Sequence, residues 1–457
     1  MTTSEFSAVL PVSAEAAFAW HARSGALQRL LPPWQSVRVI SQQPASGADS
    51  IVADGGRVEL SVPTGPLRRR WVARHQDCRP GESFTDVMER GPLRQWIHQH
   101  RFVANPDGCT LTDHIEYDLG FPACLLAGFV RRDLNRLFAF RHARTREDLR
   151  RHAEHPTKPL TIAITGASGL VGSALAAFLT TGGHRVRTIG RATPGHHADI
   201  RWNPAAGTID AAAFAGVDAV IHLAGENVAQ RWSTASQKRI RDSRVQSTAL
   251  LARTLAALPT PPPVLVMASG IGAYGTHEDD ATRDESSPFG NDFLAGVCRE
   301  WEAAAEPART AGIRVVQVRI GMVISAAGGA LAKMLPAFRL GVGGPIGGGR
   351  QWQSWIHLDD LIDVLHRAVI DKRLRGIVNA VAPQTLRQHE FAAAIGRVIR
   401  RPTFAPLPGF VVSLLFGEMG RNLLLSGTRA SPATLTALGH RWRFTDLESA
   451  LRFELGR

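Results

Sequence analysis

Cysteine is scarce in this chain. The 457 residues include only Cys78, Cys109, Cys124 and Cys298, which lie far apart and form no CxxC pair. Zinc sites and disulfide frameworks need several cysteines at short, regular spacing, so the sequence indicates neither. We therefore expect reduced thiols, a cytoplasmic location and no bound metal.

Lysine and long apolar runs are also scarce. Lysine occurs only at positions 158, 238, 333 and 372, so arginine supplies most of the 53 basic side chains. The formal net charge of +13 is spread along the chain and forms no basic arm, which argues against a nucleic-acid partner. The most apolar stretch, 119–130, is far shorter than the roughly 20 residues of a membrane-spanning helix. We expect no membrane span and, from the acidic start, no signal peptide.

Changes of periodicity divide the sequence into three predicted domains. Residues 1–155 contain short β-rich runs and end in a helical pattern over 129–149, which is typical of a curved antiparallel sheet that grips one long helix. Residues 160–385 alternate continuous apolar strands with helices, which predicts an α/β domain with a doubly wound parallel sheet. Residues 386–457 carry helical patterns and are expected to form a small, mainly helical domain.

A glycine-rich turn joins the first strand of the second domain to its first helix. The sequence ITGASGLVG places three glycines at spacing three between an apolar strand and a helical pattern. Glycine lets the backbone approach a pyrophosphate, and N–H groups at the helix start stabilise its charge. Packing of a tight turn is the alternative explanation. We predict that a dinucleotide binds here, at Gly166, Ala167, Ser168, Gly169, Leu170, Val171 and Gly172.

The ends of the next strands indicate which dinucleotide binds. Sites for NAD place an acidic residue at the end of the second strand, where it accepts a hydrogen bond from the ribose 2′-hydroxyl. Here that strand ends in TIGR with Arg191, and no acid follows until Asp199. A guanidinium suits a 2′-phosphate, so the sequence favours NADP (NADPH) unless Arg191 points into solvent. The following strand ends in Leu223, Ala224 and Gly225, which we expect beside the cofactor.

Together these motifs resemble the extended short-chain dehydrogenase/reductase superfamily. ITGASGLVG, HLAGENVAQRWS, IRDSRVQST and RIGMVIS are similar to motifs of its atypical epimerase family branch, whose members are related to nucleotide-sugar epimerases. The resemblance covers residues 160–457 and implies a Rossmann fold, an NADP cofactor and a C-terminal helical domain of unassigned role. Residues 1–155 are similar to polyketide cyclases and lipid-transfer proteins through GPLRQW and RFVANPDGCTLTDHIEY. That likeness implies a helix-grip fold around an apolar ligand.

The catalytic pair of the superfamily is missing. Its members use a tyrosine with a lysine four residues later, and the phenol exchanges a proton with the substrate while a hydride moves. The only tyrosines here are Tyr117 and Tyr274, and neither is followed by that lysine. Phe293 and Val297 stand at the corresponding place and carry neither an exchangeable proton nor a charge. The usual acid–base chemistry therefore cannot be assigned to these positions.

Three other residues are candidates for catalysis. Ser269 lies at the end of VLVMASG near the expected nicotinamide, where it suits either a substrate carbonyl or the cap of a turn. Tyr274 is the only phenol of the nucleotide domain and a candidate acid, with a position in the core as the alternative. Glu226, after the HLAG strand, is a candidate base.

The WIHLDD segment combines one histidine with two acids, His357, Asp359 and Asp360. These residue types bind metals, but here they open a predicted helix. They are better explained as a helix cap with supporting contacts, because side chains that accept hydrogen bonds suit that position. No metal site is predicted there.

The sequence thus predicts an NADP(H)-binding atypical short-chain dehydrogenase/reductase, either an oxidoreductase or an epimerase-like protein, that acts on an unknown small molecule. A non-catalytic dinucleotide sensor or scaffold is the alternative, because the Tyr–Lys pair is absent. A third possibility is that the N-terminal domain defines the function through an apolar ligand. The substrate, the direction of the reaction and the oligomeric state stay open.

Overall fold

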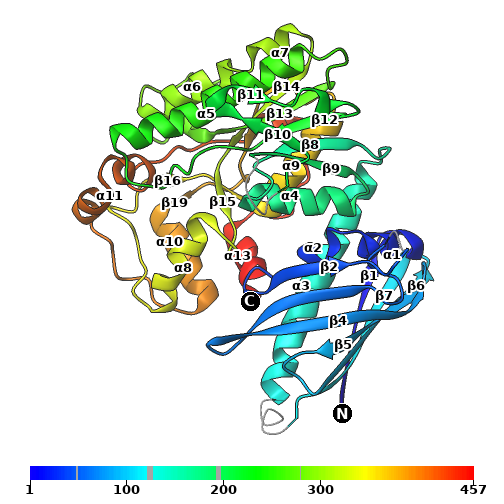
Figure 1. Cartoon of the computed structure of the whole chain (residues 1–457). Coiled ribbons are helices and arrows are strands. Elements are labelled where there is room, and N and C mark those ends of the chain that lie inside the picture. Colours follow the sequence, from blue (N-terminus) through cyan, green and yellow to red (C-terminus); the bar gives the residue numbers. More distant parts are fainter. Residues whose placement is uncertain (48–49, 121–126, 192–196, 278) are drawn as a thin grey trace. The chain divides into compact units, whose positions relative to one another are not determined.

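The computed structural model describes residues 1–457 except 48–49, 121–126, 192–196 and 278. The chain forms two compact units (Figure 1). Unit 1 comprises residues 1–159, 176–184 and 454–456, and unit 2 comprises residues 160–175, 185–453 and 457. Among the described residues, no helix combines the length and the apolar character that crossing a membrane requires.

Unit 1 is built on a seven-stranded antiparallel sheet with the strand order β1-β7-β6-β5-β4-β3-β2. The strands are β1 (Thr2–Leu10), β2 (Arg38–Gln43), β3 (Arg57–Thr64), β4 (Leu67–Arg79), β5 (Ser83–Arg90), β6 (Gln95–Asn105) and β7 (Gly108–Asp118). The helices are α1 (Ala14–Ala22), α2 (Ala26–Leu30) and the long α3 (Ala127–Glu154). The predicted helix-grip fold, one sheet with one long helix, is confirmed (Figure 1).

An apolar strip on α3 holds this helix against the sheet. Leu134 and Phe138 lie one turn apart on α3 and pack with Ile115 and Tyr117 of β7. The ring of Phe138 also stacks on Phe6 of β1, with a centroid distance of 4.6 Å. Burying one large apolar side chain contributes about 1.5–3 kcal/mol, so a few such contacts stabilise the docking of the helix.

Unit 2 is built on an eight-stranded sheet with the order β11-β10-β9-β8-β12-β13-β14-β18. Its strands are β8 (Thr161–Thr165), β9 (Arg185–Gly190), β10 (Ile200–Asn203), β11 (Thr208–Ile209), β12 (Ala219–His222), β13 (Val264–Gly270), β14 (Arg314–Ile320) and β18 (Gly376–Ala380). Neighbouring strands are parallel except β10 and β11. The strand order reverses at β8, as in a doubly wound sheet, so the predicted Rossmann fold is confirmed.

Helices cover both faces of this sheet. The helices that begin in unit 2 are α4 (Leu170–Thr181), α5 (Thr234–Ala256), α6 (Phe293–Ala303), α7 (Glu306–Thr310), α8 (Gly329–Arg339), α9 (Leu358–Ile370), α10 (Gln388–Ile399), α11 (Gly409–Leu423), α12 (Ala433–Ala437) and α13 (Leu447–Leu455). Figure 1 shows α5, α6 and α7 on one face and α9 on the other. Ile162, Ala163 and Ile164 of β8 are completely buried, because consecutive side chains of a central strand point to both covered faces.

The C-terminal segment is mainly helical, as predicted. Residues 386–453 lie in the same compact unit as the large sheet and include α10, α11 and α12. Two short ladders accompany them, β15 (Met322–Ile324) with β17 (Trp355–His357) and β16 (Trp352–Gln353) with β19 (Leu386–Arg387). That 386–457 forms a domain of its own stays a prediction.

Candidate nucleotide site and catalytic residues

The glycine-rich loop lies where the strand order reverses. It follows the carboxyl end of β8, between β9 on one side and β12 on the other. Thr165, the last residue of β8, pairs with Ile189 of β9 and His222 of β12. In open α/β sheets, ligands bind in the crevice outside the carboxyl ends of the strands at such a reversal. The fold therefore places residues 166–172 where a dinucleotide site is expected.

Two glycines of the loop have no room for a side chain. Gly166 has a φ of +68°, and a Cβ there would lie 3.0 Å from the carbonyl of Leu223 and 3.1 Å from the nitrogen of Ala224. A Cβ on Gly172 would lie 2.2 Å from the carbonyl oxygen of Gly166. The N–H of Gly169 donates to that same carbonyl at 3.0 Å and closes the turn. The loop is therefore folded tightly between β12 and the first turn of α4.

The other predicted loop residues surround the start of α4. Ser168 is exposed, and Ala167, Leu170 and Val171 are half-buried. The first N–H groups of an α-helix have no acceptor within the helix, and they favour negative charge. The loop thus offers backbone donors to a phosphate, and direct contact of these residues with a cofactor stays a prediction.

A buried polar network joins the ends of β8 and β12 under the loop. The hydroxyl of Thr165 lies 2.7 Å from Nδ1 of His222 and accepts the N–H groups of residues 223–224 at 2.9 and 3.1 Å. The hydroxyl of Ser247 on α5 lies 3.2 Å from Nε2 of the same ring. Burial, with the positive charge of Arg244, lowers the pKa of His222 to about 4. The imidazole is therefore neutral near pH 7.

The carboxyl end of β9 presents a cation. Arg191 is exposed and directly follows β9, the strand next to β8. Asp199, the first acid after it, is occupied, because its Oδ2 accepts the N–H and the hydroxyl of Thr188 at 2.7 and 2.8 Å. Burial acts to raise the pKa of Asp199, but these hydrogen bonds outweigh it and lower the pKa. Asp199 is thus held by β9, whereas Arg191 is exposed directly after this strand. That Arg191 binds a 2′-phosphate stays a prediction.

Gly225 lies beside an arginine that the sequence analysis did not single out. A Cβ on Gly225 would lie 3.2 Å from Cζ of Arg244 on α5. Nη1 of Arg244 donates to the carbonyl of Ile240 at 3.0 Å, and its guanidinium lies 5.1 Å from the ring centroid of Trp301. A cation beside the predicted cofactor segment suits a phosphate or a ribose hydroxyl. The IRDSRVQST motif contains this residue, but only folding brings it to Gly225.

Ser269, the residue before the end of β13, lies inside a buried ion-pair network. Its hydroxyl donates to Oε1 of Glu302 at 2.7 Å. Glu302 also accepts two hydrogen bonds from Arg319 of β14, at 2.8 and 2.9 Å. All three residues are at most 5% exposed. Because the hydroxyl proton points to Glu302, Ser269 presents lone pairs, and it is arranged to accept a hydrogen bond rather than to donate one to a carbonyl.

Tyr274 is packed into the interior of unit 2. It ends a 3-10 turn after β13, is 1% exposed, and donates its hydroxyl to Oδ1 of Asn379 at 2.7 Å. The guanidinium of Arg319 lies 4.8 Å from its ring centroid. Burial raises the pKa of Tyr274, against the opposing effect of Arg319 and Asn379. These contacts favour a packed position in the core. That Tyr274 acts as an acid stays a hypothesis.

Apolar packing occupies the place of the missing catalytic pair. Phe293 is the first residue of α6, and its ring centroid lies 5.0 Å from that of Trp232. Met419 and Phe416 of α11 belong to the same cluster. Val297, one turn further along α6, is 3% exposed. This helix start therefore contributes packing in place of a phenol and an ammonium group.

Glu226 lies on the loop after β12. Its Oε1 accepts a hydrogen bond from Nε2 of Gln230 at 3.1 Å and lies 3.9 Å from Nε of Arg239. The side chain is 40% exposed, so the carboxylate is accessible to a substrate proton. Glu226 thus follows β12, and Ser269 lies near the carboxyl end of β13. These two strands are parallel neighbours, so both residues lie at the sheet edge that carries the loop.

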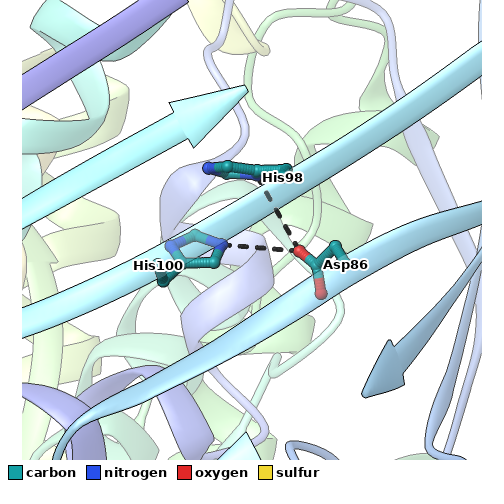
Figure 2. A group of neighbouring side chains, drawn as sticks. All are labelled: Asp86, His98 and His100. Atoms are coloured by element: carbon teal, nitrogen blue, oxygen red, sulfur yellow. Dashed lines mark ion pairs between the residues drawn. The ribbon is translucent and has the colours of Figure 1, made fainter. Parts of the chain in front are cut away.

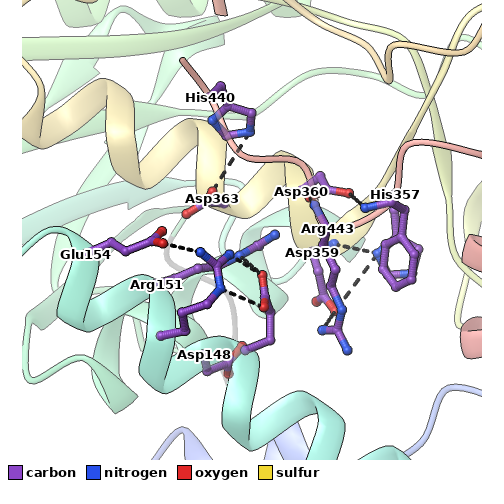
Figure 3. Close-up of polar contacts among 12 residues, drawn as sticks. Asp148, Arg151, Glu154, His357, Asp359, Asp360, Asp363, His440 and Arg443 are labelled. Atoms are coloured by element: carbon purple, nitrogen blue, oxygen red, sulfur yellow. Dashed lines mark hydrogen bonds and ion pairs between the residues drawn. The ribbon is translucent and has the colours of Figure 1, made fainter. Parts of the chain in front are cut away.

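The WIHLDD segment starts a helix. His357 is the N-cap of α9, and its Nδ1 accepts the N–H of Asp359 at 3.1 Å. Asp359 pairs with Arg443 at 3.0 Å (Figure 3). Asp360 accepts the N–H groups of Arg443 and Phe444 at 2.8 and 3.2 Å. The two acids therefore tie α9 to the segment before α13. The predicted helix cap is confirmed.

Unit 1 contains a cavity of about 320 Å³. Apolar side chains form most of its wall, including Leu27, Leu30, Val58, Leu60, Trp71, Phe84, Trp96 and Leu134. Polar side chains also reach it, namely His21, Arg23, Gln35, Gln42, His75, Asp86, His98, His100 and Arg141. A cavity of this size and lining suits a small, mainly apolar molecule with a few polar atoms.

Three family models match successive parts of the chain. The polyketide cyclase / dehydrase and lipid transport family matches residues 10–140. The NAD dependent epimerase/dehydratase family matches residues 162–380. A domain of unknown function, DUF1731, matches residues 407–454.

An epimerase family protein of Mycobacterium bovis is 40% identical over 297 residues, which cover 65% of this chain and 98% of that protein. The crystal structure of a nucleoside-diphosphate sugar epimerase from Corynebacterium glutamicum is 34% identical, with a TM-score of 0.79 over 100% of this chain and 90% of the other. The human epimerase family protein SDR39U1, isoform 2, was solved with NADPH. It is 35% identical, with a TM-score of 0.59 over 65% of this chain and 99% of the other. The chain therefore belongs to the epimerase family, an atypical branch of the short-chain dehydrogenase/reductase superfamily.

Proposed function

We propose that this chain is an NADPH-binding oxidoreductase or epimerase-like protein that acts on a small molecule. The observation that carries the proposal is the loop 166–172, which lies at the reversal of the sheet and contains glycines that exclude a side chain. The human relative solved with NADPH supports the same cofactor here. Arg191 supports NADPH over NADH, because a guanidinium binds a phosphate through charge-assisted hydrogen bonds.

Each part of the site has one task in this proposal. Backbone N–H groups of the loop bind the pyrophosphate, Arg191 binds the 2′-phosphate, and residues 223–225 lie against the cofactor. The nicotinamide, when bound, supplies hydride chemistry. Glu226 exchanges the proton with the reacting oxygen as the hydride moves. Ser269, held by Glu302, accepts a hydrogen bond from a second, non-reacting hydroxyl of the substrate.

Titration with NADPH and NADH, followed by nicotinamide fluorescence, tests the cofactor assignment. Arg191→Ala should weaken NADPH binding about 10- to 100-fold and leave NADH binding unchanged, because only NADPH carries the 2′-phosphate. Arg185→Ala is the matched control, since Arg185 is exposed at the other end of β9. Equal NADPH affinity in the wild type and in Arg191→Ala would remove this residue from the site.

A non-catalytic dinucleotide sensor or scaffold is the second candidate function. The packing of Phe293 and Val297, where the superfamily has tyrosine and lysine, favours it. In that case NADPH occupancy changes the interactions of the chain, and no substrate is converted.

Stopped-flow oxidation of bound NADPH by a panel of carbonyl compounds separates the two functions. With compounds of the panel that also carry a hydroxyl, an enzyme should oxidise NADPH at a rate that falls at least about 10-fold in Ser269→Ala, because the acceptor that positions that hydroxyl is lost. Ser286→Ala, an exposed serine of unit 2, should leave the rate unchanged. No oxidation by any compound in the panel would support the sensor.

An apolar ligand for the cavity of unit 1, and the cytoplasmic location expected from the sequence, also belong to the proposal. Mass spectrometry of small molecules that co-purify with the full chain tests the ligand. An apolar compound recovered in equimolar amount would support it, and a cavity that retains none would count against it.

A further inference from the structure

The inner face of the sheet in unit 1 carries ionisable side chains that the proposed function does not use. Asp86 on β5 pairs in register with His98 on β6, and His100 of β6 pairs with Asp113 on β7. Directly paired residues, and residues two apart on a strand, point to the same face, so these four lie together. Figure 2 shows His98 and His100 directed at Asp86.

Three potential ligand atoms converge in this cluster. Nε2 of His100 lies 3.4 Å from Oδ2 of Asp86, and Nδ1 of His98 lies 3.9 Å from the same oxygen. One ligand atom from each of the three residues lies within 4.8 Å of the other two. A tetrahedral ion with metal–ligand bonds of about 2.1 Å holds its ligands about 3.4 Å apart. We propose that Asp86, His98 and His100 bind one divalent transition-metal ion, a possibility the sequence did not reveal.

Asp113 supplies the outer contacts that orient such ligands. Its Oδ1 lies 2.8 Å from Nε2 of His98 and 2.8 Å from Nδ1 of His100. The hydrogen bond to Asp113 orients the ring of His98. Nδ1 of His98 and Nε2 of His100 face Asp86 and are the nitrogens available to an ion, which displaces any proton they carry. His75 contacts the other oxygen of Asp86, Oδ1, at 2.5 Å. The cluster therefore contains both ligands and the groups that orient them.

The charge of the cluster also suits a cation. Asp113 is 2% exposed, and the side chain of Asp86 is 23% exposed. Enclosing carboxylates in mainly apolar surroundings costs several kcal/mol per ion unless positive charge compensates. A dication bound by neutral imidazoles and Asp86 supplies that positive charge. Without a metal ion, protonated imidazoles supply it instead. Metal titration distinguishes these two sources.

The proposed site opens into the cavity of unit 1. Asp86, His98 and His100 line this cavity together with the rings of Phe84 and Trp96. With three protein ligands, a fourth position on the ion faces the cavity, which is the arrangement of catalytic rather than structural metal sites. The ligand class that fits is an apolar molecule with one oxygen donor, a carbonyl or a carboxylate, which binds the ion while its skeleton contacts the apolar wall.

Cobalt(II) is the probe that tests the site. The untagged full-length chain is treated with chelator and titrated with Co²⁺, and the absorbance of the d–d bands is followed. We expect one equivalent to bind, and His98→Gln, His100→Gln and Asp86→Asn to weaken binding about 100-fold or more. His114→Gln is the matched control, because this histidine of β7 is half-exposed and contacts surface glutamates. It should bind as the wild type does.

Two results would overturn the proposal. One is a wild-type chain that binds neither Co²⁺ nor Zn²⁺ with a Kd below about 100 μM. This result does not depend on the folding of any variant. The other is wild-type affinity in a folded His98→Gln/His100→Gln double variant, with folding established by far-UV circular dichroism. Azide should change the Co²⁺ spectrum, since it occupies the fourth position. An unchanged spectrum would contradict the open coordination position.

Discussion

Gly172 and Gly296 are both helical glycines of unit 2, but their surroundings differ. A Cβ on Gly172 would lie 2.2 Å from a backbone oxygen, whereas nothing lies within 4 Å of the Cβ position on Gly296. Gly172→Ala should therefore destabilise the fold by about 1–3 kcal/mol. Gly296→Ala should stabilise it by about 0.5–1 kcal/mol, because alanine favours a helix interior. Thermal unfolding measures both, and equal midpoints would contradict the tight packing of the loop.

Glu302 and Glu300 lie on the same helix in different environments. Glu302 is buried and binds Arg319 and Ser269, whereas the side chain of Glu300 is 44% exposed and pairs with Arg241 at the surface. Glu302→Gln should cost about 3–5 kcal/mol, because it leaves the guanidinium of Arg319 buried beside a neutral amide.

Glu300→Gln is the matched control and should change stability by less than about 1 kcal/mol. Urea unfolding monitored by tryptophan fluorescence provides both values. A loss of stability in Glu302→Gln no larger than that in the control would contradict the buried network around Ser269.

At the scale of elements, β8 and β12 are joined by a histidine that stays neutral in the fold. Burial lowers the pKa of His222 from 6.5 to about 4. Between these pH values the unfolded chain binds a proton that the folded chain does not, so stability falls as the pH decreases through this window. At pH 4.5 the loss relative to pH 7 should reach about 2.5 kcal/mol.

Unfolding free energies of the wild type and His222→Gln at pH 7 and pH 4.5 measure this contribution. The variant should lack the extra acid sensitivity, because glutamine does not titrate. The same pH dependence in both proteins would show that His222 does not control it.

The elements around the nucleotide loop could be predicted because their signals are local. Continuous apolar runs separated by helical patterns specify a covered parallel sheet, and three glycines between a strand and a helix mark the loop. Arg191 could be placed for the same reason, since it directly follows a strand whose neighbour carries the loop. Strand order then put these local features at one edge of the sheet.

The long-range contacts could not be predicted in the same way. Glu302 and Arg319 belong to a helix and a strand, and nothing local links them to Ser269. His98 and His100 show the alternation of an inward-facing strand face, but Asp86 reaches them only through the register of β5 with β6. Register depends on strand pairing across the whole sheet, so single-sequence patterns leave it open.

For the whole molecule, the chain joins a polyketide-cyclase-like unit to an epimerase family unit. If the dinucleotide binds only the folded state, NADPH at 100 times its Kd should raise the free energy of unfolding by about 2.7 kcal/mol. Calorimetric unfolding with and without NADPH checks this. A folded Gly172→Ala variant should lose this stabilisation by NADPH, because its loop no longer fits the phosphates. An equal stabilisation of the variant and the wild type would show that NADPH binds elsewhere.

The central claim is that the loop 166–172 binds a dinucleotide and that the strand next to it selects the phosphorylated form. Isothermal titration of the full wild-type chain with NADPH and with NADH tests this most directly. One site with a Kd in the micromolar range or tighter, and a preference for NADPH of at least about 10-fold, is the expected result. The absence of binding heat with both dinucleotides, or a preference for NADH, would contradict the claim.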